Sequence, residues 1–230
     1  MFLSKLTINA TSREFRRDYA DVHEMHRTVM AAFPEVSNGR PARQSHGALW
    51  RLDGTHRGFV LYVQSHVEPD WAVLADGYLA EPAHVRSLQP VLDAIAPGRK
   101  LAFRLVANPT HSVHPNGVPG QRGRGKRVAH RTPDKQVEWL ARQGEQRGFV
   151  IPLAANGQAD VAPSPCPTVR GQKRDQDRGG IVVEPVRYDG HLIITDPDAF
   201  TTAILNGIGR AKAYGCGLLS LAPMRTTDDL

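Results

Sequence analysis

The sequence predicts an α+β protein built from tandem ferredoxin-like (RRM-like) βαββαβ domains. Helix-type and strand-type hydrophobic patterns follow one another in that order over the first 95 residues, and a comparable order starts again near Gly98. The chain has 230 residues, of which 40% are hydrophobic, so it can bury a substantial core. We expect a first domain over residues 1–95, a second over 96–223, and a tail over 224–230.

The first domain opens with an alternating, half-buried strand over residues 2–8. After a polar stretch rich in arginine, Asp21 is a helix cap, with Glu24 three residues later as in a capping box. Pro34 marks the end of this helix. Its apolar stripe consists of Val22, Met25, Val29, Ala32 and Phe33.

Two strands, 48–52 and 58–64, then form a hairpin around the turn signal Asp53-Gly54. A short, weak helix is expected to begin at Glu68. The fourth strand of the domain is predicted over residues 85–92, with Pro90 interrupting it.

The second domain begins with a strand over residues 101–108, which residues 126–131 are expected to extend after a segment rich in glycine and proline. Thr132 is the predicted N-cap of a helix that has Pro133 at its first position. The remaining elements are strands over 149–153, 181–186, 191–194 and 218–221, with a second helix over 197–206.

The composition favours an anionic partner. A formal net charge of +6 and a pI of about 9.6 fit nucleic acid better than a membrane, because no basic amphipathic stretch has a strong apolar face. Cys166 and Cys216 are far apart, so neither a disulfide framework nor a zinc site is predicted. We expect no metal and no cofactor. Without a signal-type or membrane-length apolar run, a soluble, cytoplasmic protein is expected.

A glycine-rich segment, residues 207–223, carries two Gly-x-Gly pairs on either side of two cations. A predicted helix precedes it and a strand follows, which is the reverse of the order in dinucleotide and Walker phosphate loops. Two interpretations stay open: a helix C-cap with a tight turn, or a loop whose backbone amides bind an anion. The residues concerned are Gly207, Gly209, Arg210, Lys212, Gly215 and Gly217.

Two further clusters are strongly basic. Residues 170–180 include Arg170, Lys173, Arg174 and Arg178, which Asp175 and Asp177 partly offset. One such loop is ordinarily a solvated surface, but two in one domain favour a surface that follows phosphates. The second cluster contains Arg122, Arg124, Lys126 and Arg127.

Several stretches together resemble a known family, the CasE family of CRISPR repeat-processing endoribonucleases. The stretches are Leu3–Leu6, Glu24–Thr28, Phe103–Pro109, Gly125–Ala129, Thr132–Leu140 and, most specifically, Gly207–Pro223. The resemblance implies tandem ferredoxin-like domains and metal-independent cleavage of CRISPR precursor RNA on the 3′ side of a repeat hairpin. It also implies that the product stays bound within the Cascade complex, whose other subunits would be partners together with the repeat stem-loop.

Metal-independent cleavage of RNA uses the 2′-hydroxyl as nucleophile, so a site needs proton-transferring groups and cations around the phosphorus. Histidine suits proton transfer at neutral pH. His26 matches the catalytic histidine of the family, as base, acid or both. His23 stands where relatives often have tyrosine and would transfer a proton or bind a phosphate, while Arg27 beside it would contact phosphate. Arg170, Lys173 and Arg174 would hold the RNA stem.

An alternative is a non-catalytic, RRM-like RNA-binding protein that stacks bases on its sheets. Aromatic residues make up only 7% of the chain, and no predicted strand carries the aromatic pattern typical of RRM proteins. These two observations favour the endoribonuclease.

Overall fold

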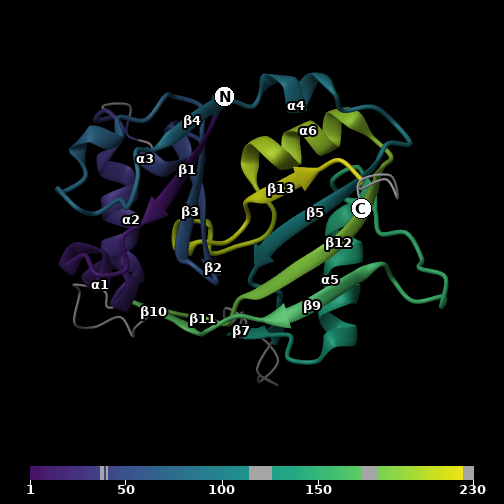
Figure 1. The fold of residues 1–230 in the computed structure, drawn as a ribbon. Helices are drawn as coiled ribbons and strands as arrows, with labels where there is room; N and C mark the ends of the chain where they lie inside the picture. The colour runs from purple at the N-terminus through teal and green to yellow at the C-terminus, as the bar shows by residue number, and fades with distance from the viewer. Residues whose placement is uncertain (37–38, 40, 114–125, 172–180, 225–230) are drawn as a thin grey trace.

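The computed structural model describes residues 1–36, 39, 41–113, 126–171 and 181–224, which form a mixed α+β fold with antiparallel sheets (Figure 1). The elements of the N-terminal part are β1 (Phe2–Ile8), α1 (Arg13–Ala20), α2 (Val22–Ala31), α3 (Ala42–Ser45), β2 (Leu49–Thr55), β3 (Gly58–Ser65), the 3₁₀ helix η1 (Trp71–Val73), β4 (His84–Ser87) and α4 (Gln89–Asp93).

The C-terminal part contributes more strands than helices. Its elements are β5 (Lys100–Ala107), β6 (Thr110–Val113), β7 (Lys126–Ala129), α5 (Pro133–Glu145), β8 (Phe149–Val150), β9 (Val161–Pro165), β10 (Val169–Gly171), β11 (Ile181–Val183), β12 (Val186–Ile194), α6 (Pro197–Asn206), the 3₁₀ helix η2 (Lys212–Tyr214) and β13 (Leu219–Ala222).

The N-terminal sheet has the strand order β2-β3-β1-β4, and every pair in it is antiparallel. Alternate residues of its strands turn toward α1 and α2, which cover one face, because side chains on a strand alternate with a period of two. The core between the sheet and the helices includes Leu6, Phe15, Met25, Val29 and Leu61. This packing holds α2, the helix that carries the two candidate histidines, against a rigid sheet.

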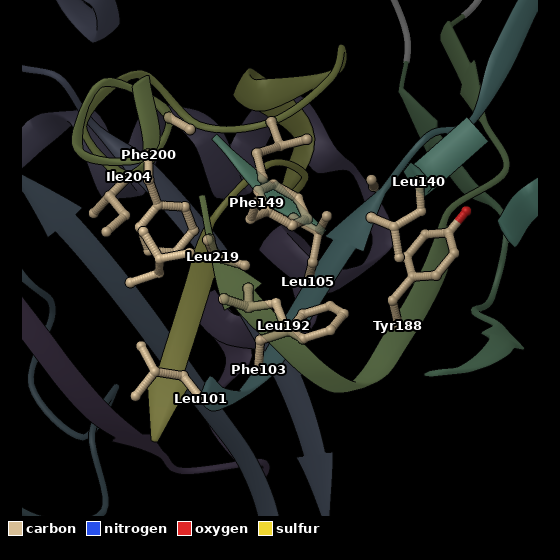
Figure 2. Packing of buried hydrophobic residues seen from close by; sticks show 14 of the residues in the cluster. Leu101, Phe103, Leu105, Leu140, Phe149, Tyr188, Leu192, Phe200, Ile204 and Leu219 are labelled. Atoms are coloured by element: carbon tan, nitrogen blue, oxygen red, sulfur yellow. The ribbon is translucent and has the colours of Figure 1, made fainter. Parts of the chain in front are cut away.

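The C-terminal sheet has the order β13-β5-β12-β8, and β9 also pairs with β12. Helices α5 and α6 pack on it through the core drawn in Figure 2. Two short ribbons stand apart from the sheets: β6 pairs with β7, and β10 pairs with β11.

Polar side chains join the two sheets. Arg51 of β2 bonds Asp53 at 2.8 Å and the Ser220 hydroxyl of β13 at 2.9 Å. Arg104 of β5 reaches Asp53 at 3.5 Å, and the Gln64 amide donates to the Ile204 carbonyl at 2.8 Å. Because Arg51 is almost fully buried, these bonds satisfy a charge that would otherwise be costly to bury. They fix the end of α6 relative to the N-terminal sheet.

Helix α1 was not predicted from the sequence, and neither were the short helices α3 and α4. Residues 13–20, which look merely polar and arginine-rich, form α1, capped by the Ser12 hydroxyl that accepts from the Phe15 amide at 3.3 Å. Only Phe15 and Asp18 of this helix are buried. The Asp18 carboxylate accepts a hydrogen bond from the Tyr78 hydroxyl at 2.9 Å. Because one of the two buried residues is charged, the helix has no apolar stripe that can be recognised in the sequence.

Three predictions in the N-terminal part were wrong in detail. The hairpin is present, but β2 continues through Asp53 and Gly54, and the turn lies at residues 56–57. Asp53 stays in the strand because Arg51 and Arg104 bind its carboxylate. The helix expected from Glu68 is only η1. The strand expected over 85–92 ends at Ser87, where α4 begins with Pro90 in its first turn, a position that proline tolerates.

The C-terminal part also required corrections. Residues 126–129 do not extend the strand over 101–108, because they pair with β6 in a separate ribbon. The predicted strands 181–186 and 191–194 are divided differently, into β11 and the long strand β12. Of the strand predicted over 149–153, only β8 forms. Strand β9 was not anticipated, since its two prolines disguise it; it runs along β12.

None of the helices in the described ranges combines the length and the hydropathy that a membrane crossing requires.

Candidate functional site

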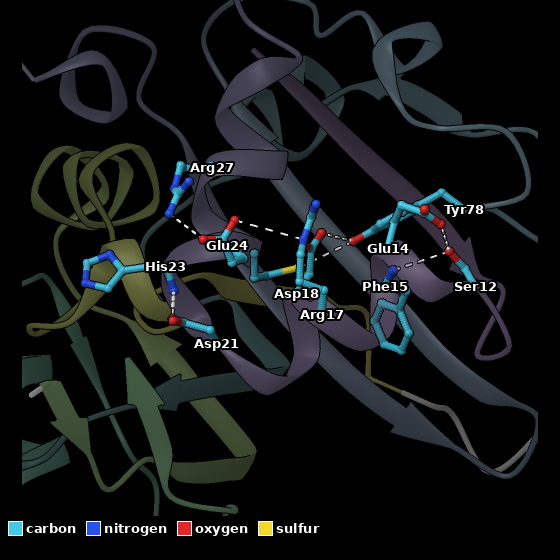
Figure 3. Close-up of polar contacts among 11 residues, drawn as sticks. Ser12, Glu14, Phe15, Arg17, Asp18, Asp21, His23, Glu24, Arg27 and Tyr78 are labelled. Atoms are coloured by element: carbon cyan, nitrogen blue, oxygen red, sulfur yellow. Dashed lines mark hydrogen bonds and ion pairs between the residues drawn. The ribbon is translucent and has the colours of Figure 1, made fainter. Parts of the chain in front are cut away.

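The start of α2 is capped as its sequence predicts, but not as a complete capping box. The Asp21 carboxylate accepts from the His23 amide at 2.8 Å. Glu24 pairs instead with Arg27 and lies 4.0 Å from Arg17 of α1. Figure 3 shows Glu24 between these two arginines, with His23 and Arg27 both projecting from α2.

His23 and His26 are one helical turn apart, so their side chains leave the same side of α2. Both are half-buried, and among the described residues neither His23 Nε2 nor His26 Nδ1 has a hydrogen-bond partner. Buried nitrogen atoms without a protein partner are uncommon in folded proteins. The arrangement leaves both rings available to a ligand.

The electrostatic surroundings keep His26 neutral. Burial lowers its pKa from the usual value of 6.5, and Arg43 and His23 lower it further. Arg43 comes from the short helix α3 and donates to the Ala48 carbonyl at 3.2 Å. A neutral imidazole can accept a proton at pH 7, which is the property required of a general base.

Helix η2 packs against α2 and contributes two more polar groups to this site. The Tyr214 ring lies edge-on to His23, with 5.5 Å between the ring centroids. Burial lowers the pKa of Lys212, and the nearby Arg43 and Arg147 lower it further. The site therefore combines two imidazoles, a phenol and several cations, a set that can transfer protons and stabilise a phosphorane.

The glycine segment explains how η2 reaches α2. All four glycines, Gly207, Gly209, Gly215 and Gly217, have positive φ values of 74° to 93°. Residues other than glycine rarely adopt this backbone conformation. A Cβ at Gly215 would lie 2.9 Å from the Trp50 ring, and one at Gly207 would lie 2.8 Å from Leu49. The glycines thus allow a compact turn to pack closely against the N-terminal sheet.

Part of the segment follows the C-cap interpretation. The Gly207 amide donates to the Ala203 carbonyl at 2.8 Å and ends α6, as a C-cap does. Two further amides are used within the protein: Ile208 donates to the Gly217 carbonyl at 2.9 Å, and Gly217 donates to the Val106 carbonyl at 2.7 Å. These amides hold the segment in place, while Arg210 stays exposed.

The other predicted basic residues fall into separate groups. Arg27 is exposed and paired with Glu24. Arg170 is exposed on β10, close to the start of α2, because a Cβ at neighbouring Gly171 would lie 3.0 Å from His23. Lys173 and Arg174 lie outside the described residues. Lys126 and Arg127 are exposed on β7.

Arg127 and Arg210, which are far apart in the sequence, line one cavity of about 400 Å³. Arg142 and Arg147 line the same cavity, and neither was singled out from the sequence. Arg43 and Tyr214 were also missed. Arg43 lies in a four-residue helix without a hydrophobic period, and Tyr214 looked like an ordinary member of the glycine segment.

In the part of the chain that the structure describes, no three or more histidine, cysteine, aspartate or glutamate side chains are grouped to hold a metal ion.

Residues 1–223 match the profile of a family described as CRISPR associated protein. The chain is 37% identical over 229 residues to the CRISPR-associated endoribonuclease Cse3 of Thermus thermophilus, covering 97% of this chain and 100% of the relative. It is 30% identical over 199 residues to the CRISPR system Cascade subunit CasE of Escherichia coli K12, covering 80% and 94%.

Among solved structures, CRISPR endoribonuclease Cse3 bound to 19-nucleotide RNA superposes with a TM-score of 0.80 at 34% identity, covering 97% of this chain and 100% of that one. Both the sequence and the fold are therefore shared over almost the full length. This chain belongs to the CRISPR associated protein family.

Proposed function

We propose that the chain is an endoribonuclease that cuts CRISPR precursor RNA within its repeats, 3′ of the repeat hairpin, and then stays bound to the product as a Cascade subunit in the cytoplasm. The observation that carries the proposal is the pair His23 and His26 on α2, with cations nearby, in a chain that has one relative named as a CRISPR-associated endoribonuclease and another named as a Cascade subunit.

His26 is the general base in the proposed reaction. Its neutral imidazole accepts the proton of the 2′-hydroxyl, whose oxygen bonds to the adjacent phosphorus while the bond from phosphorus to the 5′-oxygen breaks. The leaving oxygen takes a proton, for which His23 is the proposed donor. The products are a 2′,3′-cyclic phosphate and a 5′-hydroxyl, so atoms and charge balance without a metal ion.

Cations near His26 stabilise the charge that develops on the phosphorane. Arg43 is close enough to lower the pKa of Lys212 and also that of His26. Donors that are already in place lower the barrier because the protein does not have to reorganise during the reaction. Arg27 is proposed to contact phosphate after leaving Glu24.

The remaining RNA contacts are proposed along the basic surfaces and the glycine segment. Arg170, Lys173 and Arg174 would hold the stem, since A-form RNA presents mainly its backbone and shape to a protein. The other proposed contacts are Lys126, Arg127, Arg210, Lys212 and the backbone at Gly209 and Gly215. The amides of Gly207 and Gly217, which the sequence also suggested, are bonded within the protein and so are not proposed as RNA contacts.

We assign the fold as tandem ferredoxin-like domains over 1–95 and 96–223, with a tail over 224–230. Supporting this, each part has one four-strand path in which its own strands follow the order 4-1-3-2. The first part departs from the full pattern, because only η1 stands where its second helix would be.

Incubation of repeat RNA with the protein in EDTA tests the proposed activity. We expect cleavage at a single site, leaving a 5′-hydroxyl on one fragment and a 2′,3′-cyclic phosphate or 3′-phosphate on the other. End-group analysis of the products on a denaturing gel measures this. Binding without cleavage would instead support the alternative of a non-catalytic RNA-binding protein.

The role of the first basic cluster, residues 170–180, which we call the basic hairpin, is tested by replacing Arg170, Lys173 and Arg174 with alanine. We expect weaker binding of repeat RNA and a flatter dependence of log affinity on log salt, by about 0.7 to 0.9 for each phosphate that the variant no longer neutralises. The single-turnover rate should recover at saturating protein, because holding the stem and transferring protons are separate tasks.

A control triple variant has the same net charge as the variant of Arg170, Lys173 and Arg174. Arg13, Arg57 and Arg99 are exposed on separate elements, and their replacement by alanine removes three cations elsewhere. An equal change of salt slope in the two triple variants would show that residues 170–174 are only a solvated basic surface, and would pass the role to Arg122, Arg124, Lys126 and Arg127.

A further inference from the structure

Four arginines from three distant parts of the chain meet at one cavity, which we call the four-arginine cavity. Arg127 belongs to β7, Arg142 lies near the end of α5, Arg147 follows that helix, and Arg210 belongs to the glycine segment. The cavity has a volume of about 400 Å³, which is large enough for part of a nucleotide.

No carboxylate compensates these charges from within the cavity. Among the described residues that line it, none is an aspartate or a glutamate, and none of the four arginines forms an ion pair with a described residue. Glu138 lies near Arg142, but its carboxylate is bonded by Lys135 at 2.9 Å. Four guanidinium groups held together without counter-charges attract an anion, and their planar donors suit phosphate.

Two residues that line the cavity, Gly209 and Arg147, help to bring the arginines together and to keep them partly shielded from water. Gly209 lets the loop that carries Arg210 lie against α5, because a Cβ there would come within 3.2 Å of the Trp139 ring. Arg147 is half-buried, and burial lowers its pKa, so part of its hydration has already been removed. A desolvated guanidinium gains more from an incoming anion than one that is fully exposed.

The cavity also has an unsatisfied polar group in its wall. The Asn108 Oδ1 atom is buried and has no hydrogen-bond partner in the described part of the chain. Whichever way the amide is turned, one of its polar atoms needs a partner. A nucleotide would supply a partner to both groups: a phosphate for the arginines, and a sugar hydroxyl or base atom for Asn108.

The glycine segment connects the cavity with the histidine site, because Arg210 lines the cavity and η2, two residues further along, packs against α2. Arg147 acts on the pKa of Lys212, Lys212 is also near Arg43, and Arg43 acts on the pKa of His26. Cations therefore follow one another from the four-arginine cavity to His26. A strand of RNA whose reactive phosphate lies at His26 has a path of positive charge leading into this cavity.

We propose that the four-arginine cavity binds a backbone phosphate of the RNA that is cut at His26, and that Arg142 and Arg147 are positioning residues for this strand. The proposal rests on the proposed function. It adds a second phosphate anchor, separate from the basic hairpin at residues 170–174. An RNA held at two anchors presents only one of its bonds to His26.

The test is a double-mutant cycle on repeat-RNA binding with Arg142→Gln, Arg210→Gln and their combination. We expect each single change to weaken binding about tenfold and to reduce the salt slope by about 0.7. The double variant should lose clearly less than the product of the two factors, because both arginines contact the same phosphate. Thermal midpoints of the variants check that they fold.

Arg99→Gln is the matched control. Arg99 is exposed and precedes β5, whereas Asn108 follows the other end of that strand, roughly 30 Å away. We expect Arg99→Gln to change binding less than twofold and to combine multiplicatively with Arg142→Gln. If Arg142→Gln and Arg210→Gln behave like Arg99→Gln, or combine multiplicatively with each other, the four-arginine cavity is not a shared phosphate site.

Two further arms separate the possible failures. If the wild-type protein neither binds nor cuts repeat RNA, the proposed function itself fails; if it does both and the cavity variants match the control, only this inference fails. Inorganic phosphate is tested against chloride at equal ionic strength. RNA binding should be weakened more by phosphate than by chloride, because inorganic phosphate competes with the RNA for the cavity, and Arg142→Gln should reduce this difference. Specific phosphate binding that Arg142→Gln abolishes without affecting RNA binding would instead assign the cavity to a free anion.

Discussion

The His26→Ala protein is expected to bind repeat RNA almost as tightly as the wild type and to cut it about 10²- to 10⁴-fold more slowly, the usual contribution of a general acid-base group. His26 is half-buried, its Nδ1 atom has no partner in the described residues, and its pKa is lowered so that the ring is neutral. Removing it takes away a proton acceptor without breaking a hydrogen bond that holds the described fold.

Single-turnover cleavage at saturating protein measures this loss, with binding measured separately at the same salt concentration. His56→Ala is the matched control, because His56 lies exposed in the turn between β2 and β3. The His56→Ala protein should cut RNA at the wild-type rate. Cleavage by a folded His26→Ala protein within a factor of ten of the wild-type rate would remove His26 from the mechanism.

The pH dependence identifies the role of His26. Since its folded-state pKa lies below the usual 6.5, the neutral base form is fully present above that value and is lost as pH falls through the lowered pKa. The rate at subsaturating protein, which reports on the free enzyme, should therefore fall on the acidic side below pH 6.5. This acidic limb should be absent from the residual activity of His26→Ala.

Replacing the 2′-hydroxyl at the cut site with hydrogen is expected to abolish cleavage while leaving binding nearly unchanged. The 2′-oxygen is the nucleophile in the proposed reaction, and no other group in the RNA can form the cyclic phosphate. The protein would still hold the stem and the backbone phosphates, which this change does not alter. Single-turnover assays in EDTA and binding assays with the same RNA measure the two properties.

An RNA with the deoxyribose one nucleotide away from the cut site is the control, and it should be cut at the normal rate. If the RNA with deoxyribose at the cut site is cleaved at the same bond, the nucleophile comes from elsewhere and the assignment of His26 as the base for the 2′-hydroxyl is wrong.

Features that depend on neighbouring residues were predictable from the sequence. Asp21 caps α2 because an aspartate side chain reaches backbone amides only two or three residues ahead. The three-residue spacing of His23 and His26 places them together on any helix. Alternation along residues 2–8 likewise predicted β1, because the buried face of a strand repeats every second residue.

The resemblance of separate stretches to a family also identified the chain before its fold was known, and the match over residues 1–223 confirms it. The hairpin shows the limit of such local signals. Asp53-Gly54 is a strong turn signal in the sequence, yet the strand continues through it because Arg51 and Arg104, the latter from another sheet, bind the Asp53 carboxylate.

By itself, the sequence determined the family, the helices α2, α5 and α6, most of the longer strands, and the placement of His23 and His26 on one side of a helix, since these depend on short spacings. Only the tertiary structure decided what surrounds them. Lys212 and Tyr214 reach α2 because a compact glycine turn packs η2 against it, and Arg43 comes near His26 from α3. Arg127, Arg142, Arg147 and Arg210 share one cavity because a ribbon, a helix end and a loop meet there, and such contacts between distant segments are fixed by packing of the whole chain.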